Sequence, residues 1–231
     1  MFVDVKACNF SARIIAGSET DSFDWLTNRV TSQSRMNIQP VTLTGQHIRL
    51  EPLINARSRL DELWQAADEP DLWKYMPYGP IDSPARVQWL IEELLSREMR
   101  GTDLPFVTIH QATNTAIGMT RFMTLDRANR GLEIGGTWLG NPHRRTAANT
   151  EAKYLMFTHA FETLGAIRLQ IRTDLRNERS QRAIERLGLV REGVARKNMI
   201  MPDGYHRSSI FYSVIDEEWP ALKAKLQALL L

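Results

Sequence analysis

The spacing of apolar residues changes twice along this chain, and these changes constrain its fold more than any other feature. Three central segments alternate apolar and polar residues, as half-buried strands do: 104–111, 116–125 and 131–139. From Asn149 to Leu164 apolar residues recur at helical spacing, and residues 167–172 alternate again before a second helical pattern that ends at Gly188. This order predicts an antiparallel meander followed by helices and strands in alternation.

The segments on either side complete the predicted sheet. They indicate a strand at 47–53, helices at 56–67 and 84–100, strands at 190–200 and 207–214, and a last helix from about Asp216. The last two strands flank Pro202-Asp203-Gly204, in which glycine supplies the positive φ of a tight turn. We therefore predict a mixed α/β (α+β) fold, with one twisted mixed sheet of about seven strands and helices on both faces.

Length and composition allow one domain and an extension. With 231 residues, 43% of them hydrophobic, the chain can bury one substantial core. Residues 1–40 show no sustained periodicity, and we expect a poorly ordered N-terminal extension there, followed by a domain that spans 41–231. Met36 is a candidate alternative start.

Charge and cysteine content argue against several classes of function. The 29 basic and 27 acidic residues leave a net charge of +2, too small for a protein that mainly neutralises phosphates. Cys8 is the single cysteine and the five histidines lack metal-ligand spacing, so neither a disulfide nor a metal site is expected. No apolar run approaches the roughly 18 residues of a membrane span. We expect a cytoplasmic protein without a metal, a membrane or a specific nucleic acid as partner.

Residues 141–152 lie between a predicted strand and the start of a helix, where free backbone N–H groups and the helix dipole favour an anion. Arg144 and Arg145 add positive charge, so phosphate would be a natural ligand. In the alternative interpretation, Asn149 or Thr150 only caps the helix and both arginines are solvated. Spacing alone does not choose between the two.

Two further segments carry candidate site residues. Asn177 follows the next predicted strand and either caps the helix after it or turns its amide toward a ligand between the two parallel strands; Ser180 faces the same cleft or water. The aromatic, proline-rich segment 73–80 either lines a substrate cleft or anchors itself to the core.

Three stretches of sequence in a fixed order carry a family resemblance. They are Gly131-Leu132-Glu133-Ile134-Gly135-Gly136-Thr137-Trp138-Leu139, Arg144 to Lys153, and Asn177 to Gly193. With the ending Asp203-Gly204-Tyr205-His206-Arg207 and then Glu217-Glu218-Trp219, they resemble the RimJ/RimL type of the GNAT superfamily of N-acetyltransferases.

This resemblance implies the GNAT fold, in which the fourth and fifth strands splay apart and acetyl-CoA, the co-substrate, lies between them. The strand at Trp138 and Leu139 would pair with the pantetheine arm, and Asn177 would contact it. The residues implied for the pyrophosphate, mainly through backbone N–H groups, are Arg144, Arg145, Thr146, Ala147, Ala148, Asn149 and Thr150.

The sequence departs from the family pattern at two places. Ala147 and Asn149 occupy positions at which the phosphate loop usually has glycine or a small residue, which makes close backbone approach harder. Ile184 stands where many members carry a tyrosine that acts as general acid, so that role must fall elsewhere.

Acetyl transfer to an amine needs a base, an acid and stabilisation of the oxyanion. We expect Glu133 to be the base, directly or through a water, although a strand glutamate is more often an exposed cross-strand partner. Ser180 is the candidate acid, and backbone N–H groups near Trp138 would meet the oxyanion. The only cysteine lies outside the domain, which favours direct attack by the amine in a ternary complex.

Other functions stay open at this point. The missing glycines and tyrosine would also suit a non-catalytic module that binds acyl-CoA or a protein partner. A nucleic-acid site would use the arginines Arg144, Arg145, Arg168 and Arg172. The acceptor, a protein N-terminal α-amine or a small-molecule amine, is not identified, and a homodimer is one arrangement that the sequence allows.

Overall fold

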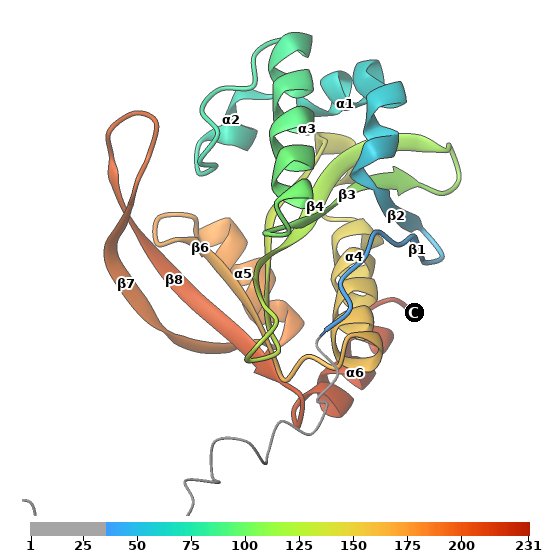
Figure 1. Cartoon of the computed structure of the whole chain (residues 1–231), viewed down its shortest axis with the longest axis vertical. Helices are drawn as coiled ribbons and strands as arrows, with labels where there is room; N and C mark the ends of the chain where they lie inside the picture. Colours follow the sequence, from blue (N-terminus) through green and yellow to red (C-terminus); the bar gives the residue numbers. More distant parts are fainter. Residues whose placement is uncertain (1–35) are drawn as a thin grey trace, which may run out of the picture. The chain divides into compact units, whose positions relative to one another are not determined.

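The computed structural model describes residues 36–231, and one eight-stranded sheet forms its centre (Figure 1). The strands lie in the order β1-β2-β3-β4-β5-β6-β8-β7. Their bounds are β1 Leu43–Thr44, β2 Ile48–Pro52, β3 Leu104–His110, β4 Thr115–Asp126, β5 Gly131–Leu139, β6 Arg168–Asp174, β7 Val190–Ile200 and β8 His206–Ile215. The seven predicted strands are confirmed, and β1 is a two-residue addition.

The predicted extension 1–40 lies mostly outside the described residues, as does Cys8. Within the described part, the side chains of Met36 and Ile38 are buried in the main hydrophobic cluster. The packed domain therefore already includes Met36, ahead of the predicted boundary at residue 41.

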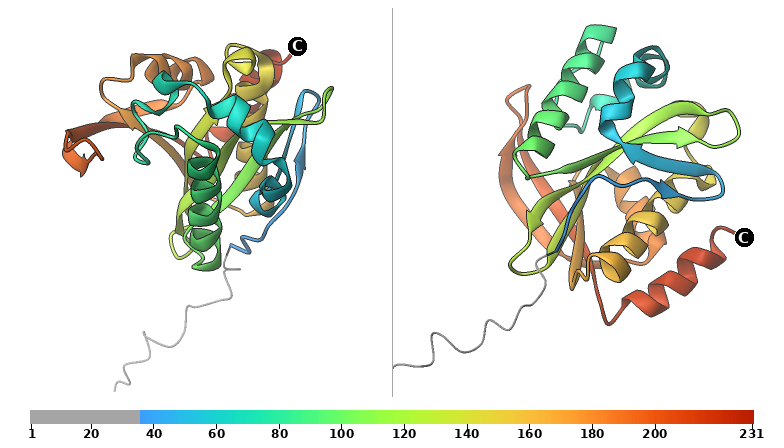
Figure 2. Two further views of the ribbon diagram at one scale, coloured as in Figure 1. Left: turned by 90° about the horizontal axis from the view of Figure 1, so that it is seen from above. Right: turned by 45° about the vertical axis from the view of Figure 1, so that its right-hand side comes forward.

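Helices cover the sheet on both faces, as predicted (Figures 1 and 2). One face carries η1 Leu53–Arg59, α1 Leu60–Ala67, α2 Pro70–Trp73 and α3 Pro84–Met99. The other carries α4 Ala147–Thr158, which continues as η3 His159–Thr163, and α5 Glu178–Leu187 and α6 Trp219–Ala228. Each group of helices encloses its own cluster of buried apolar residues. Within residues 36–231, no helix combines the length and apolar character needed to cross a membrane.

Strands β5 and β6 form the only parallel pair among the described strands, and they stay together briefly. Their pairing runs from Gly131 and Arg168 to Glu133 and Gln170, after which the strands diverge. If the two-residue β1 is left out of the count, β5 and β6 are the fourth and fifth strands. The splay predicted between these two strands is thus confirmed. Between β4 and β5 the register shifts so that Met119 faces Trp138 but Arg121 faces Gly135. This β-bulge contains Gly136, whose φ of 58° favours glycine.

Helix boundaries show where sequence spacing was imprecise. Helix α4 begins at Ala147 and Thr146 caps it, so the prediction that the helix starts at Asn149, with Asn149 or Thr150 as cap, is wrong. Helix α6 begins at Trp219 rather than near Asp216. Gly188 ends α5 in the left-handed conformation with φ 110°, as predicted.

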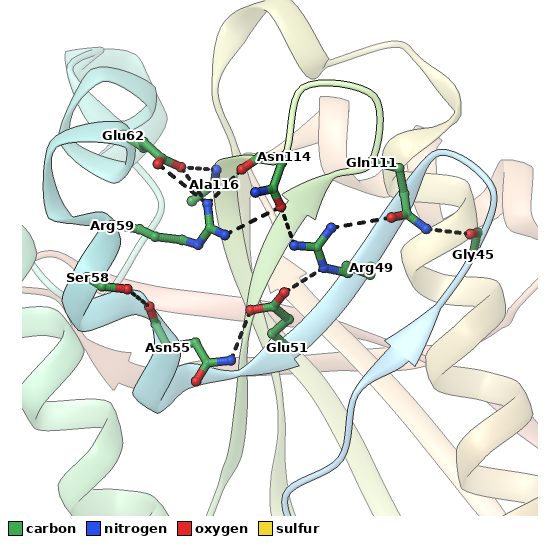
Figure 3. Close-up of polar contacts among 10 residues, drawn as sticks. All are labelled: Gly45, Arg49, Glu51, Asn55, Ser58, Arg59, Glu62, Gln111, Asn114 and Ala116. Carbon is green, nitrogen blue, oxygen red and sulfur yellow. Dashed lines mark hydrogen bonds and ion pairs between the residues drawn. The ribbon is translucent and has the colours of Figure 1, made fainter.

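A polar network joins β2, the first helices and the β3–β4 turn (Figure 3). Arg49 pairs with Glu51 at 2.5 Å, and Arg59 pairs with Glu62 at 3.1 Å. Arg49 and Arg59 also donate hydrogen bonds to Asn114 in the turn. These contacts hold β2 and α1 against the turn between β3 and β4.

The two outer strands of the sheet are unlike regular strands. β1 has two residues. Most residues of β7 are exposed, and its register against β8 shifts between Arg191 and Gly193 and between Ala195 and Met199. Lys197, within the second irregularity, has a φ of 48°.

Candidate functional site

The opening between β5 and β6 brings the two polar segments to one end of the sheet. After its last residue, Leu139, β5 leads through a short 3-10 turn to the N-terminus of α4, and β6 leads from Asp174 to the N-terminus of α5. The carboxyl ends of diverging parallel strands form a crevice in which open sheets commonly bind ligands. The predicted residues therefore flank one crevice.

The start of α4 has the features of an anion site. The Thr146 hydroxyl accepts a hydrogen bond from the N–H of Ala148 at 3.2 Å, and helix geometry leaves other first-turn N–H groups without intrahelical partners. Thr150 is buried, and its hydroxyl accepts a bond from Arg186 at 2.8 Å. Neither Asn149 nor Thr150 is the cap, and both lie in the first turn of α4.

The two arginines of this segment differ in their surroundings. Arg144 donates to the carbonyl of Leu139 at 2.9 Å and pairs with Glu69 at 2.8 Å, and this pair ties the end of β5 to the loop before α2. Arg145 is exposed and has a φ of 62°. Of the two arginines, Arg145 is therefore the one that is exposed to solvent beside the N-terminus of α4.

The missing glycines cost no backbone strain. Ala147 and Asn149 lie in the first turn of α4, and neither has a positive φ. The left-handed residue of the segment is Arg145, which no feature of the sequence predicted. Only the extra side-chain atoms of Ala147 and Asn149 distinguish this loop from one with glycines there.

Asn177 and Ser180 meet at the start of α5. The side-chain oxygen of Asn177 accepts a bond from the N–H of Ser180 at 3.1 Å, so the capping interpretation of Asn177 is confirmed. Because the cap uses the amide oxygen, the NH₂ group of Asn177 can still donate to a ligand. Ser180 is half-buried, and its hydroxyl makes no hydrogen bond within residues 36–231.

The strand residues Trp138 and Leu139 have buried side chains, so they offer a ligand mainly their backbone. Trp138 packs edge-on against Trp73, with ring centroids 5.3 Å apart. Trp73 and Tyr78 anchor the aromatic segment 73–80 to the core, whereas Tyr75 is half-exposed beside Arg176.

Glu133 lies where the two strands separate, and its side chain is buried. Arg172 lies 2.9 Å from one carboxylate oxygen. The other oxygen accepts bonds from Gln170 at 3.0 Å and Thr124 at 3.3 Å. Glu133 is therefore not an exposed cross-strand partner, because β4 and β6 both contribute donors around it.

Further ion pairs lie beside the opening. Arg121 of β4 pairs with Asp103 at 2.7 Å, and both side chains are buried. The fully buried carboxylate of Asp174 pairs with Arg176 at 3.0 Å. Burial lowers the pKa of Arg207, and nearby Asp174 partly opposes this shift. None of these pairs was predicted from the sequence to belong to the site.

Lys153 is a buried residue that was not predicted from the sequence to belong to the site. Its ammonium donates to the Thr137 hydroxyl on β5 at 2.7 Å, and Thr137 in turn contacts the Thr120 hydroxyl at 2.8 Å. Burial lowers the pKa of Lys153 to about 7. A usable signal existed, since Lys153 lies one turn before the buried Phe157 in the predicted helix.

The nucleic-acid hypothesis finds little support in these contacts. Of its four arginines, three are engaged in ion pairs: Arg144 with Glu69, Arg168 with Glu192 and Arg172 with Glu133. Among residues 36–231, no group of three or more His, Cys, Asp or Glu side chains is placed to hold a metal ion.

Comparison with known proteins defines the class. The family model described as acetyltransferase (GNAT) domain matches residues 47–190, more than half of the chain. The chain therefore belongs to the GNAT acetyltransferase family.

Individual relatives include proteins named as N-acetyltransferases and solved structures with the same fold. The chain is 34% identical over 106 residues to the "Putative ribosomal N-acetyltransferase YdaF" of Bacillus subtilis, a match covering 46% of this chain and 57% of that protein. The crystal structure of a GCN5-related N-acetyltransferase from Brucella melitensis has a TM-score of 0.78 and 32% identity, covering 84% of this chain and 87% of that one. RimJ of Mycobacterium smegmatis, in complex with CoA-disulfide, shares the fold with a TM-score of 0.69 at 20% identity, covering 82% and 95%.

Proposed function

We propose that the protein transfers an acetyl group from acetyl-CoA to a primary amine, either a protein N-terminal α-amine or a small-molecule amine. The observation that carries this proposal is the three-residue pairing of β5 and β6, which opens toward the N-terminus of α4. A crevice of this form, within the GNAT family, suits a long co-substrate whose charged end lies at a helix terminus.

In this proposal the segment from Arg145 to Thr150 binds the pyrophosphate through backbone N–H groups, helped by the exposed Arg145 side chain. Arg144 holds the end of β5 in place through Glu69 and Leu139. The pantetheine arm pairs with the backbone at Trp138 and Leu139. The relative crystallised with CoA-disulfide supports a CoA compound as the ligand.

We further propose that Asn177 donates its NH₂ group to the pantetheine arm, while its oxygen continues to cap α5. The alternative role, capping alone, predicts that Asn177→Asp would leave acetyl-CoA affinity unchanged, because aspartate also caps helices but has no NH₂ donor.

The chemical step in this proposal is direct attack within a ternary complex. The amine nitrogen attacks the thioester carbon, the carbonyl oxygen takes the negative charge, and the carbon–sulfur bond then breaks with the electron pair leaving on sulfur. Glu133 removes the amine proton through a water molecule, since protein donors already contact both carboxylate oxygens. The half-buried Ser180 hydroxyl gives a proton to the departing thiolate.

Calorimetric titration with acetyl-CoA tests the binding part. We expect micromolar affinity that Arg145→Ala weakens about tenfold, since the lost phosphate contact would be worth about 1.4 kcal/mol. Arg191→Ala, which removes another exposed arginine from the outer strand β7, is the matched control and should bind normally. If the folded protein binds no acetyl-CoA, the acetyltransferase proposal is wrong.

Turnover with a panel of amines tests the catalytic part. Glu133→Gln and Ser180→Ala should each lower kcat, Glu133→Gln by about 10²-fold, as expected for loss of a general base. Near-normal kcat in both variants would contradict these assignments. Acetyl-CoA binding without transfer to any amine would instead favour the non-catalytic acyl-CoA-binding or protein-interaction module.

The cytoplasm is the location that we propose for this reaction. It rests on the single cysteine of the sequence and on a relative named as a ribosomal N-acetyltransferase.

A further inference from the structure

The hydroxyl of Tyr78 lies against the β-bulge of β5. A Cβ atom added to Gly136 would lie 2.8 Å from the Tyr78 oxygen, so a side chain at Gly136 would displace Tyr78 or distort the strand. Gly136 also has a positive φ, and both constraints favour glycine. The structure therefore brings a phenol hydroxyl from a distant loop directly onto the backbone of the splayed strand.

Two buried groups fix the position of this hydroxyl. Arg121 donates a hydrogen bond to the Tyr78 oxygen, and Asp103 holds the Arg121 guanidinium at 2.7 Å. The exposed fractions are 7% for Tyr78, 3% for Arg121 and 7% for Asp103. The Tyr78 backbone is also held, because its carbonyl accepts a bond from Arg86 at 2.9 Å.

The direction of the Arg121–Tyr78 bond decides what the hydroxyl can do. A guanidinium has donors only, so the Tyr78 oxygen must be the acceptor. Its own hydrogen then remains free to be donated to another group. The positive charge of Arg121 strengthens such a donor, since it stabilises electron density that builds up on the phenol oxygen.

The place of this donor coincides with the end of the crevice. β5 and β6 separate just after Glu133, so a co-substrate arm that follows β5 inward from Leu139 must end beside residues 134–137. The bulge at Gly136 lies within that interval. The reactive end of the arm would therefore lie beside the Tyr78 hydroxyl.

We propose that Tyr78 is a catalytic residue that donates a hydrogen bond to the thioester carbonyl oxygen. This inference rests on the proposed acetyl transfer. When the amine nitrogen attacks the carbonyl carbon, the π electrons move to oxygen, and the Tyr78 hydroxyl stabilises that oxyanion together with backbone N–H groups of β5. As the carbon–sulfur bond breaks, the carbonyl re-forms and the hydrogen bond weakens. Tyr78 keeps its proton throughout, while sulfur gains one proton and the amine loses one.

Tyr78→Phe tests the proposal, because it removes the hydroxyl and keeps the packed ring. We expect kcat to fall about 10²-fold, the loss typical of one oxyanion donor. The KM for acetyl-CoA and its calorimetric affinity should stay within about twofold, and the shape of the pH profile of kcat should not change. Tyr212→Phe is the matched control, since its hydroxyl contacts Glu185 of α5 instead, and its kcat should stay close to that of the unmodified protein.

The outcomes separate this inference from the proposed function. Acetyl-CoA binding and transfer by the unmodified protein, with normal kcat in Tyr78→Phe, would overturn the role of Tyr78 alone. A Tyr78→Phe profile that loses its alkaline limb would also overturn it, because Tyr78 would then be a general acid. If the unmodified protein transfers no acetyl group, the proposed function itself fails. Thermal unfolding of each variant sets a temperature at which all of them are folded during the assays.

Discussion

The network around Arg59 and the ion pairs beside the β5–β6 opening use the same residue types, but water reaches them differently. The side chains of Arg59 and Glu62 are 17% and 36% exposed, whereas those of Arg121 and Asp103 are 3% and 7% exposed. Partly exposed pairs are screened and add little stability, while buried pairs carry a desolvation cost that their attraction offsets only when the geometry is good. We infer that the buried pairs are retained for what they position.

Loss of one buried partner gives the largest expected effect. Arg121→Met leaves Asp103 buried without its counter-charge, and we expect the free energy of unfolding to fall by about 3–5 kcal/mol. Denaturant unfolding measures this change. The double variant Asp103→Asn, Arg121→Met should lose less than the single variant, because no uncompensated charge remains. A loss below about 1 kcal/mol for the single variant would remove the contrast between the two networks.

Lys153 extends the comparison to a buried cation without a carboxylate partner. Its side chain is buried, and no carboxylate contributes to the shift of its pKa. Burial lowers the pKa of Lys153 to about 7 in the folded protein. The unfolded chain, with an ordinary lysine, binds more protons between this pKa and the usual value near 10.4, so stability should rise with pH across that window.

The measurement is unfolding at pH 7 and pH 9 for the unmodified protein and Lys153→Met. The unmodified protein should gain about 2 kcal/mol more than the variant between these two values, and above about pH 10.5 the stabilities of the two proteins should change with pH in the same way. Parallel pH curves for the two proteins would show that Lys153 keeps an ordinary pKa.

The smallest effect is expected in the network of Figure 3. A double-mutant cycle with Arg59→Ala and Glu62→Ala should give a coupling energy of about 0.5 kcal/mol that decreases at high salt. Acetyl-CoA binding should be unchanged, since neither residue makes a hydrogen bond to a residue proposed to bind the co-substrate. A coupling energy as large as that between Arg121 and Asp103 would contradict the comparison.

The sequence predicted what local spacing encodes and missed what distant contacts decide. The repeat of Val87, Leu90 and Leu94 defined α3, and Gly188 marked the end of α5, because both features act within a few residues. The pairing of Arg144 with Glu69 joins residues 75 positions apart, so no local sequence pattern could indicate it.

The candidate site shows the same limit. The sequence placed Asn177 at the start of α5, and the structure has it there as the cap. The sequence did not distinguish Arg144 from Arg145. Their spacing does not show which of them pairs with a distant carboxylate and which faces solvent. Tyr78 looked like one aromatic among several in the segment 73–80, because only the folded chain brings its hydroxyl to Gly136.

The irregular outer strands have a consequence for association between molecules. An unpaired strand edge presents N–H and C=O groups on which a strand of another chain can add. Here one edge is the two-residue β1, too short for such a template. At the other edge, the two register shifts and the left-handed Lys197 interrupt the unpaired hydrogen-bonding row of β7. The long ribbon of β7 and β8 can thus extend from the body of the molecule while resisting the edge-to-edge stacking that leads to aggregates.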